Sequence, residues 1–159
     1  MKVGEALQSY LRAYDFGDTQ GGYDDRWARL KFGRVVFWVP NIEARRQAVK
    51  RHDVNHILTG YEPIVLKGEL QIAAFELASG CGKYWFAWFV NLVGLPLMVF
   101  YPRLCVRAFF RGLRTRRNIY RDYTLGEAVW ARSVDDLRLE MGISDLDKPV
   151  KKPTIVLSW

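Results

Sequence analysis

The sequence is poor in the residues that cross-link small proteins or bind metals, with two cysteines and two histidines among 159 residues. Cys81 and Cys105 form no CxxC pair, and two thiols cannot supply a disulfide framework, so we expect a reducing, cytoplasmic environment. We also expect no export signal, because Glu5 and Arg12 interrupt the apolar core that a signal peptide would need. Repeats and low-complexity segments are absent, which favours a single domain over residues 1–159.

Charge is missing from one long stretch and crowded into the next. Residues 84–101 carry no formal charge, whereas arginines recur through residues 103–121 of a chain whose net charge is +7. A block of this kind predicts an anionic partner, either lipid headgroups or nucleic acid. Because half of the residues are apolar, the chain can also bury a substantial core.

Apolar spacing and capping signals predict a mainly α, single-domain helical bundle. Asn41 is the expected N-cap of the helix that carries both histidines. Thr124 and Ser133 resemble the caps of two short helices that end near Gly142. The longer expected helices cover residues 2–15, 41–58 and 63–79.

A small N-terminal β-hairpin is expected beside this bundle. Residues 26–31 and 34–39 alternate around Gly33 and are rich in valine, phenylalanine and tryptophan, as strands commonly are. Residues 154–159 could add a third strand to the hairpin.

The two histidines, His52 and His56, lie four residues apart with Asp53 between them. On a helix these positions bring two imidazoles and a carboxylate to one side. Glu69 follows on the next expected helix, and a tight turn would bring it back beside the first. The four side chains predict a divalent-metal site, for which imidazole ligands favour zinc, with iron, manganese or magnesium also compatible.

Residue chemistry alone leaves two other interpretations open. Both histidines could lie on a solvated helix face, since pairs with this spacing are common. The HExxH arrangement of zinc proteases is disfavoured for two reasons. Asp53 has a shorter side chain than the glutamate of that motif, and Glu69 follows His56 at a smaller sequence separation than the third ligand usually does in that class.

A longer pattern surrounds the histidines. It comprises an HDxxH motif with a glycine soon after, a Gly-Glu pair, an aromatic-Glu pair and a later arginine-rich and apolar block. The segments are residues 51–60, Gly68-Glu69, Phe75-Glu76, residues 107–112, Trp130 and residues 137–143. This pattern resembles the family of coenzyme Q biosynthesis protein 4, most clearly over residues 41–143.

The resemblance implies a helical, membrane-associated metalloprotein of ubiquinone biosynthesis with His52, Asp53, His56 and Glu69 as ligands. It implies a metal-dependent removal or oxidative replacement of the C1 carboxylate on a polyprenylated ring intermediate, with no catalytic residue identified. We expect the protein to lie on the inner face of the cell membrane, beside other quinone-biosynthesis proteins. A homo-oligomer is compatible with this resemblance. The alternative is a non-catalytic isoprenoid-lipid carrier or scaffold with a structural or headgroup-binding metal.

The chain departs from the family pattern in two places. His56 and Glu69 enclose one residue more than is usual in the family, and residues 1–40 do not match its longer N-terminal part. Two further residues could serve the site: Glu76 could orient a ligand, and Arg51 could hold an anionic substrate group. A surface or capping role is the alternative for both.

Residues 84–101 are nearly long enough to span a bilayer, although Gly94 and Pro96 interrupt them and a buried core helix is an alternative. Clustered aromatics and the following arginines favour a monotopic protein whose apolar helix lines a prenyl-lipid groove or enters one leaflet. No nucleic-acid binding is expected, because no recognition helix or stacking platform accompanies the arginines. The expected lipid contacts are Trp85, Trp88, Phe89, Arg103, Arg107 and Arg111.

Overall fold

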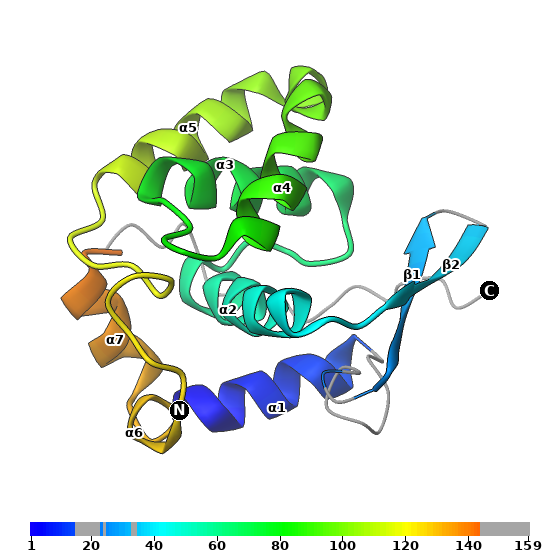
Figure 1. Cartoon of the computed structure of the whole chain (residues 1–159). Coiled ribbons are helices and arrows are strands. Elements are labelled where there is room, and N and C mark those ends of the chain that lie inside the picture. The colour runs from blue at the N-terminus through cyan, green and yellow to red at the C-terminus, as the bar shows by residue number, and fades with distance from the viewer. Residues whose placement is uncertain (15–22, 24, 33–34, 144–159) are drawn as a thin grey trace.

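The computed structural model describes residues 1–14, 23, 25–32 and 35–143, and this part of the chain is mainly helical, as expected (Figure 1). The α-helices are α1 (Val3–Ala13), α2 (Glu43–Thr59), α3 (Leu66–Ser79), α4 (Trp85–Gly94), α5 (Pro102–Leu113), α6 (Glu127–Trp130) and α7 (Val134–Met141), with a 3₁₀ helix, η2 (Leu95–Phe100), between α4 and α5.

Helix α2 lies at the centre of the bundle (Figure 1). Helix α1 packs on one side of it and α3 and α4 pack on the other, while α5 runs along α3. The core between these elements includes Leu58, Ile72 and Phe75, each almost fully buried. The central helix therefore receives neighbours on both sides, and side chains from both sides can reach its histidines.

Strands β1 (Trp27–Phe32) and β2 (Val35–Pro40) pair antiparallel, with Trp27 opposite Pro40 and Phe32 opposite Val35. The pair projects away from the helices in Figure 1. Each strand lies one residue further along the chain than the sequence pattern suggested. The expected strand over residues 154–159 falls outside the described residues.

The predicted cap of the histidine-bearing helix is wrong. Helix α2 begins at Glu43 with Ile42 in the N-cap position. The Asn41 amide instead donates to the carbonyls of Tyr23 at 3.1 Å and Asp25 at 2.7 Å. These bonds tie the start of α2 to the segment before β1, and they prevent the side chain from capping the helix.

The predictions for the later helices are mixed. Helix α3 begins at Leu66, a few residues after the expected start, although it ends at Gly80 as expected. Gly126, and not Thr124, takes the N-cap position of α6. Ser133 does cap α7, because its hydroxyl accepts from the backbone N–H groups of Asp135 and Asp136, and α7 ends at Gly142.

Two arginines hold the C-terminal end of α2. Arg138 of α7 donates to the carbonyl of Ile57 at 2.7 Å and to that of Leu58 at 2.9 Å. Arg111 of α5 donates to the carbonyl of Thr59 at 2.9 Å. The last carbonyls of a helix lack partners within the helix and carry partial negative charge, so these guanidinium groups stabilise the end of α2.

Two glycines permit the close packing that positions α3. A Cβ on Gly112 would overlap the carbonyl of Phe75, so the backbones of α5 and α3 are in direct contact there. A Cβ on Gly68 would overlap the carbonyl of Glu62, where the α2–α3 connection folds over the first turn of α3. This second approach places Glu69 beside α2.

The uncharged stretch does not form one helix. Helix α4 buries Ala87 and Asn91 and exposes most of its other side chains, which differs from a core helix. Within the described residues, no helix is both long enough and apolar enough to cross a membrane. We call the exposed apolar side chains of this region the apolar surface: Trp85, Phe89, Val90, Leu92, Val93, Leu95, Leu97, Val99, Phe100, Val106, Phe109, Phe110 and Leu113.

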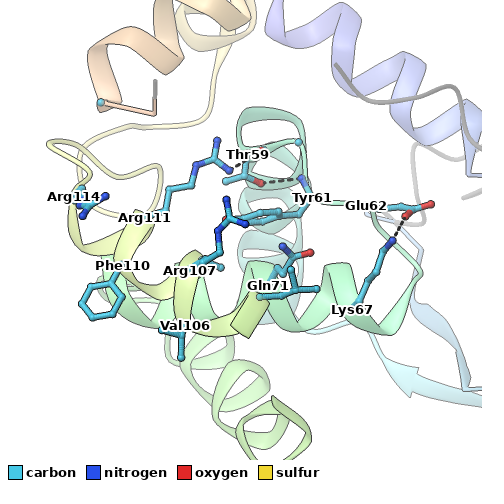
Figure 2. A pocket seen from close by; sticks show the side chains of 14 residues that line it. Thr59, Tyr61, Glu62, Lys67, Gln71, Val106, Arg107, Phe110, Arg111 and Arg114 are labelled. Carbon is cyan, nitrogen blue, oxygen red and sulfur yellow. Dashed lines mark hydrogen bonds and ion pairs between the residues drawn. The ribbon is translucent and has the colours of Figure 1, made fainter. Parts of the chain in front are cut away.

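A cavity of about 650 Å³ lies between α5 and the segment that joins α2 to α3 (Figure 2). Residues 59–62 form one wall, and Arg107 and Arg111 of α5, with Arg114 just after that helix, form the opposite wall. Lys67 and Gln71 reach it from α3. The cavity therefore brings several cationic side chains to one place.

Candidate metal centre

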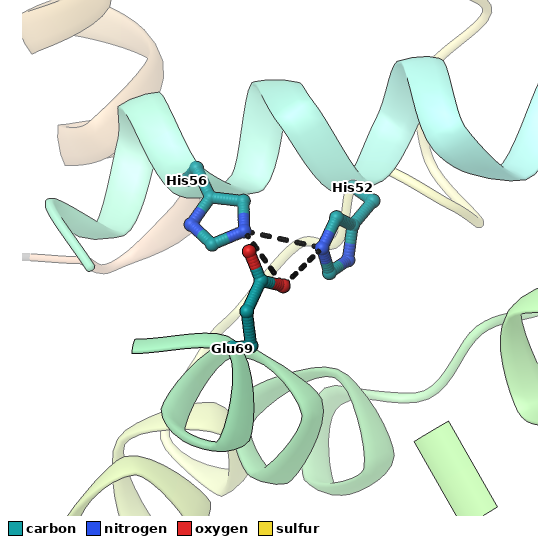
Figure 3. A group of neighbouring side chains, drawn as sticks. All are labelled: His52, His56 and Glu69. Carbon is teal, nitrogen blue, oxygen red and sulfur yellow. Dashed lines mark hydrogen bonds and ion pairs between the residues drawn. The ribbon is translucent and has the colours of Figure 1, made fainter. Parts of the chain in front are cut away.

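Side chains from two helices converge beside the centre of α2 (Figure 3). His52 and His56 project from successive turns of α2, and Glu69 approaches from the first turn of α3. The two Nε2 atoms are 3.1 Å apart, and Glu69 Oε2 lies 3.3 Å from that of His52 and 3.6 Å from that of His56. In the part of the chain that the structure describes, these three residues form a group whose possible ligand atoms all lie within 4.8 Å of one another.

The spacing of the three donors fits a small divalent ion. Zinc bonds of about 2.0–2.1 Å in tetrahedral geometry hold neighbouring ligand atoms about 3.3 Å apart. The three separations, 3.1, 3.3 and 3.6 Å, lie around this value. Three protein donors would leave a further coordination position for water or substrate.

The opposite ring nitrogens of both histidines have hydrogen-bond acceptors. His56 Nδ1 lies 3.0 Å from the carbonyl oxygen of Tyr61, and His52 Nδ1 lies 3.2 Å from Oε1 of Glu76. A carbonyl can only accept, so His56 carries its proton on Nδ1 and directs the lone pair of Nε2 into the group. A carboxylate acceptor has the same effect on His52. Two such lone pairs 3.1 Å apart, next to a carboxylate, need a cation between them.

Glu76 is the centre of a buried polar network and is 1% exposed. Its Oε1 also accepts from the Asn55 amide at 2.9 Å and from the Tyr120 hydroxyl at 3.1 Å, and its Oε2 accepts from the Asn91 amide at 2.8 Å. Burial opposes ionisation, but His52 and the two amides outweigh it and lower the pKa of Glu76. An ionised Glu76 therefore orients His52, through partners that the sequence pattern did not reveal.

The histidines and Glu69 also shift each other's ionisation. Burial alone would lower the pKa of His52, but Glu76 and Glu69 raise it well above its ordinary value. Burial alone would raise the pKa of Glu69, but hydrogen bonds and attraction from His52 and His56 lower it strongly. Without a metal ion, a proton on His52 supplies the positive charge that this group requires.

Asp53 does not join the convergent group. Its carboxylate accepts hydrogen bonds from the hydroxyls of Tyr10, at 3.4 Å, and Tyr23. Burial raises the pKa of Asp53, and burial beside this carboxylate raises the pKa of both tyrosines, so the hydroxyls remain protonated donors. The Tyr10 ring also stacks on His56, with centroids 6.2 Å apart. Helix α1 thus covers His56 and Asp53, which its apolar spacing alone could not indicate.

Arg51 lies on another side of α2. Its guanidinium sits 4.1 Å from the ring centroid of Tyr84 and donates to the backbone carbonyl and side chain of Gln47 at 3.0 and 2.9 Å. These contacts, all between described residues, involve none of His52, His56 and Glu69. The structure therefore does not place Arg51 beside the candidate metal position.

The expected lipid contacts differ in their exposure. Trp85 and Phe89 are 58% and 57% exposed, whereas Trp88 is half-buried and donates from its indole to the carbonyl of Gly82. Arg103 and Arg107 are exposed on α5. The half-buried Arg111 lines the cavity beside α5 and contacts the end of α2.

The structure thus brings together His52, His56 and Glu69 of the four predicted ligands, with Glu76 behind them and Asp53 bonded to tyrosines. No protein-family model, curated protein or solved structure matches the chain.

Proposed function

We propose that this chain is a metal-binding, membrane-associated protein of ubiquinone or polyprenyl-lipid biosynthesis that acts on the C1 carboxylate of a prenylated ring intermediate. The observation that carries the metal is the convergence of two imidazole Nε2 atoms and the Glu69 carboxylate at 3.1–3.6 Å. The resemblance to coenzyme Q biosynthesis protein 4 supplies the substrate class, because the same residues form its HDxxH and Gly-Glu motifs.

The exposure of the three donors indicates the direction of substrate approach. The side chain of Glu69 is 39% exposed and that of His56 is 1% exposed, so a ring carboxylate would enter from the Glu69 side. A bound divalent ion would supply Lewis-acid stabilisation of its negative charge. The backbone N–H of Ile64 holds Glu69 Oε1 at 2.7 Å, so the rim of the site is positioned by the α2–α3 connection.

The other residues of the site hold its geometry. Glu76 and the Tyr61 carbonyl fix the orientation of the two imidazoles. Tyr10 and Tyr23 bind Asp53 and keep α1 over the buried side, which excludes water there. We assign no proton transfer to a particular residue, and the activity in this proposal is a metal-dependent decarboxylation.

The apolar surface favours a second candidate function and a location. So many exposed apolar side chains within residues 85–113 are unusual on a protein that contacts only water. With arginines on the adjoining α5, they suit the headgroup boundary of an anionic membrane. We therefore also consider a non-catalytic isoprenoid-lipid carrier or scaffold for quinone-biosynthesis enzymes, located on the inner face of the cell membrane.

Complementation of a ubiquinone-deficient bacterial strain tests the proposal. The strain should lack the endogenous step at the ring carboxylate and should receive the wild type, His56→Ala, Glu69→Ala or Glu43→Ala. Glu43 is an exposed carboxylate on the same helix as the histidines and serves as the control. We expect the wild type and Glu43→Ala to restore quinone, and the two ligand variants to leave a carboxylated precursor.

The outcomes separate the candidate functions. Restoration of quinone by both ligand variants, when the purified variants have lost the metal, would exclude the metal-dependent enzyme. Quinone loss without accumulation of a carboxylated precursor would favour the lipid carrier or scaffold. Absence of stoichiometric metal in the wild type, measured by elemental analysis, would contradict both.

A further inference from the structure

One residue of the α2–α3 connection has a strained backbone. Ile64 has a φ of 67°, and in the part of the chain that the structure describes it is the one residue other than glycine with a positive φ. The left-handed region is unfavourable for L-residues with a side chain, and most of all for a β-branched one. The Ile64 side chain is 47% exposed, so its burial offsets little of this cost. Another contact must therefore stabilise the conformation.

That contact is the hydrogen bond that the Ile64 backbone N–H donates to Oε1 of Glu69, at 2.7 Å. Hydrogen bonds to an ionised carboxylate are stronger than those between neutral groups. The bond differs from a capping box, in which the third residue of a helix binds the N–H of the N-cap residue. Val65 holds the N-cap position of α3 and Glu69 is the fourth residue of that helix, so the carboxylate reaches one residue beyond the cap.

The neighbours of Ile64 are fixed on both sides. The Val65 carbonyl accepts from the N–H groups of Gly68 and Glu69, at 2.8 and 3.0 Å. On the other side, the Glu62 carbonyl lies so close to Gly68 that a Cβ there would overlap it. Strained residues persist where the surrounding structure holds them in this way, and they cluster at ligand-binding sites. The fold itself thus sets the direction of the Ile64 N–H.

The two oxygens of Glu69 consequently have different partners. Oε1 accepts from Ile64, whereas Oε2 lies 3.3 Å from Nε2 of His52 and 3.6 Å from Nε2 of His56 (Figure 3). A carboxylate with one oxygen engaged by a donor offers the other oxygen to a cation. Two imidazoles and one carboxylate oxygen form a three-donor set, which suits a four-coordinate zinc ion with one open position. Magnesium and manganese instead favour six ligands, mostly oxygen.

We propose that Ile64 is a positioning residue of the metal centre, whose strained backbone N–H restricts Glu69 to one ligand oxygen and so selects four-coordinate ions such as zinc over six-coordinate ones. This role rests on the proposed metal centre, because without an ion there is nothing to select. Ile64 acts through its backbone, so the pattern of histidines and carboxylates in the sequence does not reveal it. The bond between Ile64 and Glu69 is already present in the metal-free protein, and it can be measured there.

The most direct test removes the N–H alone. The α-hydroxy acid analogue of isoleucine, introduced at position 64 by nonsense suppression, replaces the N–H with an ester oxygen and keeps the side chain. The same replacement at position 66, with the analogue of leucine, is the matched control. Leu66 is the first residue of α3, where the backbone N–H has no partner within the helix. A further variant, Ile64→Gly, keeps the N–H and removes the strained side chain.

Two readouts with bound metal distinguish selection of the ion from a general effect on the fold. Competition with a fluorescent chelator gives the affinities for zinc and manganese. Cobalt, which replaces zinc in such sites, gives visible absorption bands that weaken as its coordination number rises. The ester at position 64 should lower the zinc affinity roughly tenfold or more, as loss of a contact that supports a metal ligand does. It should lower the manganese affinity less and weaken the cobalt bands, whereas Ile64→Gly and the ester at position 66 should behave as the wild type does.

A third readout needs no metal. Amide hydrogen exchange at Ile64, followed by NMR in the presence of a chelator, reports the bond to Glu69 directly. Glu69→Ala should accelerate this exchange roughly 10- to 100-fold, the usual effect of losing a hydrogen bond to a charged group. Glu62→Ala is the control, because Glu62 lies in the same connection and pairs with Lys67. It should leave the exchange unchanged.

The outcomes separate the role of Ile64 from the metal centre itself. A wild type that binds neither zinc nor cobalt would contradict the metal centre and the selection with it. A fully folded ester variant at position 64 with the zinc affinity, metal preference and cobalt bands of the wild type would overturn the role of Ile64 and leave the metal centre intact. Unchanged exchange in Glu69→Ala would overturn it without any metal. So would equal effects of the esters at positions 64 and 66, or loss of zinc binding in Ile64→Gly.

Discussion

The buried Oε1 of Glu76 lies 3.2 Å from Nδ1 of His52, and through this contact a residue of α3 determines which nitrogen of a histidine on α2 faces Glu69. We predict that Glu76→Gln weakens zinc binding roughly 10- to 100-fold, as loss of such supporting carboxylates does. A glutamine at position 76 would have to direct its amide N–H groups towards Asn55, Asn91 or Tyr120. The N–H and O–H groups of these residues already donate to the Glu76 carboxylate, so two donors would face each other. Competition with a fluorescent zinc chelator measures the affinity.

The matched control for this variant is Glu43→Gln, which removes an exposed carboxylate from α2. It should leave the zinc affinity unchanged. An unchanged affinity in Glu76→Gln, with the fold intact by circular dichroism, would show that His52 does not need this contact.

The metal-free protein should be most stable between about pH 4.5 and 6.5. The pKa of His52 is raised above 6.5, so its contribution to stability is complete below that pH and is lost as pH rises towards the folded-state value. The pKa values of Glu69 and Glu76 are lowered below 4.5, so their contributions are present above that pH and are lost as it falls. Urea unfolding midpoints across this range, recorded with a chelator, test the prediction.

Zinc should reverse the alkaline part of this profile, because it binds the unprotonated imidazoles. The stabilisation by zinc should therefore be larger at pH 8 than at pH 5.5. A metal-free protein whose stability rises steadily from pH 6.5 to 8 would contradict the charge assignment of the site.

Asp53→Asn should weaken zinc binding less than His52→Ala, His56→Ala or Glu69→Ala. The three latter residues supply the converging atoms, whereas the Asp53 carboxylate is bonded to Tyr10 and Tyr23. Elemental analysis after dialysis gives the metal content of each variant. Complete loss of metal in Asp53→Asn would instead identify Asp53 as a fourth ligand that must leave its tyrosines when the ion binds.

Gly112→Ala should lower the free energy of unfolding by about 1–3 kcal/mol, the usual cost of forcing an extra group into packed structure. The new Cβ would overlap the carbonyl of Phe75 and push α5 away from α3. Gly126→Ala is the control, because a Cβ there meets nothing within 4 Å. Denaturant titrations of both variants give the two free energies, and equal values would mean that α5 can shift without cost.

The double variant Val99→Asp/Phe100→Asp should abolish flotation with vesicles that contain phosphatidylglycerol. These side chains are 71% and 66% exposed at the end of η2, so the fold should tolerate the change while the membrane contact should not. Leu139→Asp alters an equally exposed apolar residue on α7, at 76%, and should float as the wild type does. If the control variant also fails to float, the added negative charge and not the loss of apolar contact would explain the result, and membrane binding would depend on charge alone.

Local patterns were enough to predict three of the converging residues. His52 and His56 are four residues apart and thus lie about 40° from each other around a helix of 3.6 residues per turn, so they share a face. The chain turns back at Pro63, and Glu69 on α3 therefore lies opposite the two histidines. Asp53 is about 100° around α2 from His52. It faces α1 and Tyr23, and the spacing of the motif does not show which side chains pack against Asp53.

The partners that complete the site could not be predicted, because they come from distant parts of the chain. Asn91 and Tyr120 meet Glu76 only after α4 and the segment beyond α5 have packed on α3. The error at Asn41 has the same origin. Its local preference for capping is weaker than the two carbonyls that the folded chain brings to its amide.

The contacts of Arg111 and Arg138 with the last carbonyls of α2 also impose an order on biogenesis. On the ribosome, the segment that bears both imidazoles emerges long before the guanidinium groups that terminate its helix, and domains fold as units once their distant contacts are available. A nascent chain that has not yet released residue 138 therefore has a histidine helix with a frayed end. A metal ion at the proposed centre should accordingly bind after residue 138 has emerged, and not to the shorter nascent peptide.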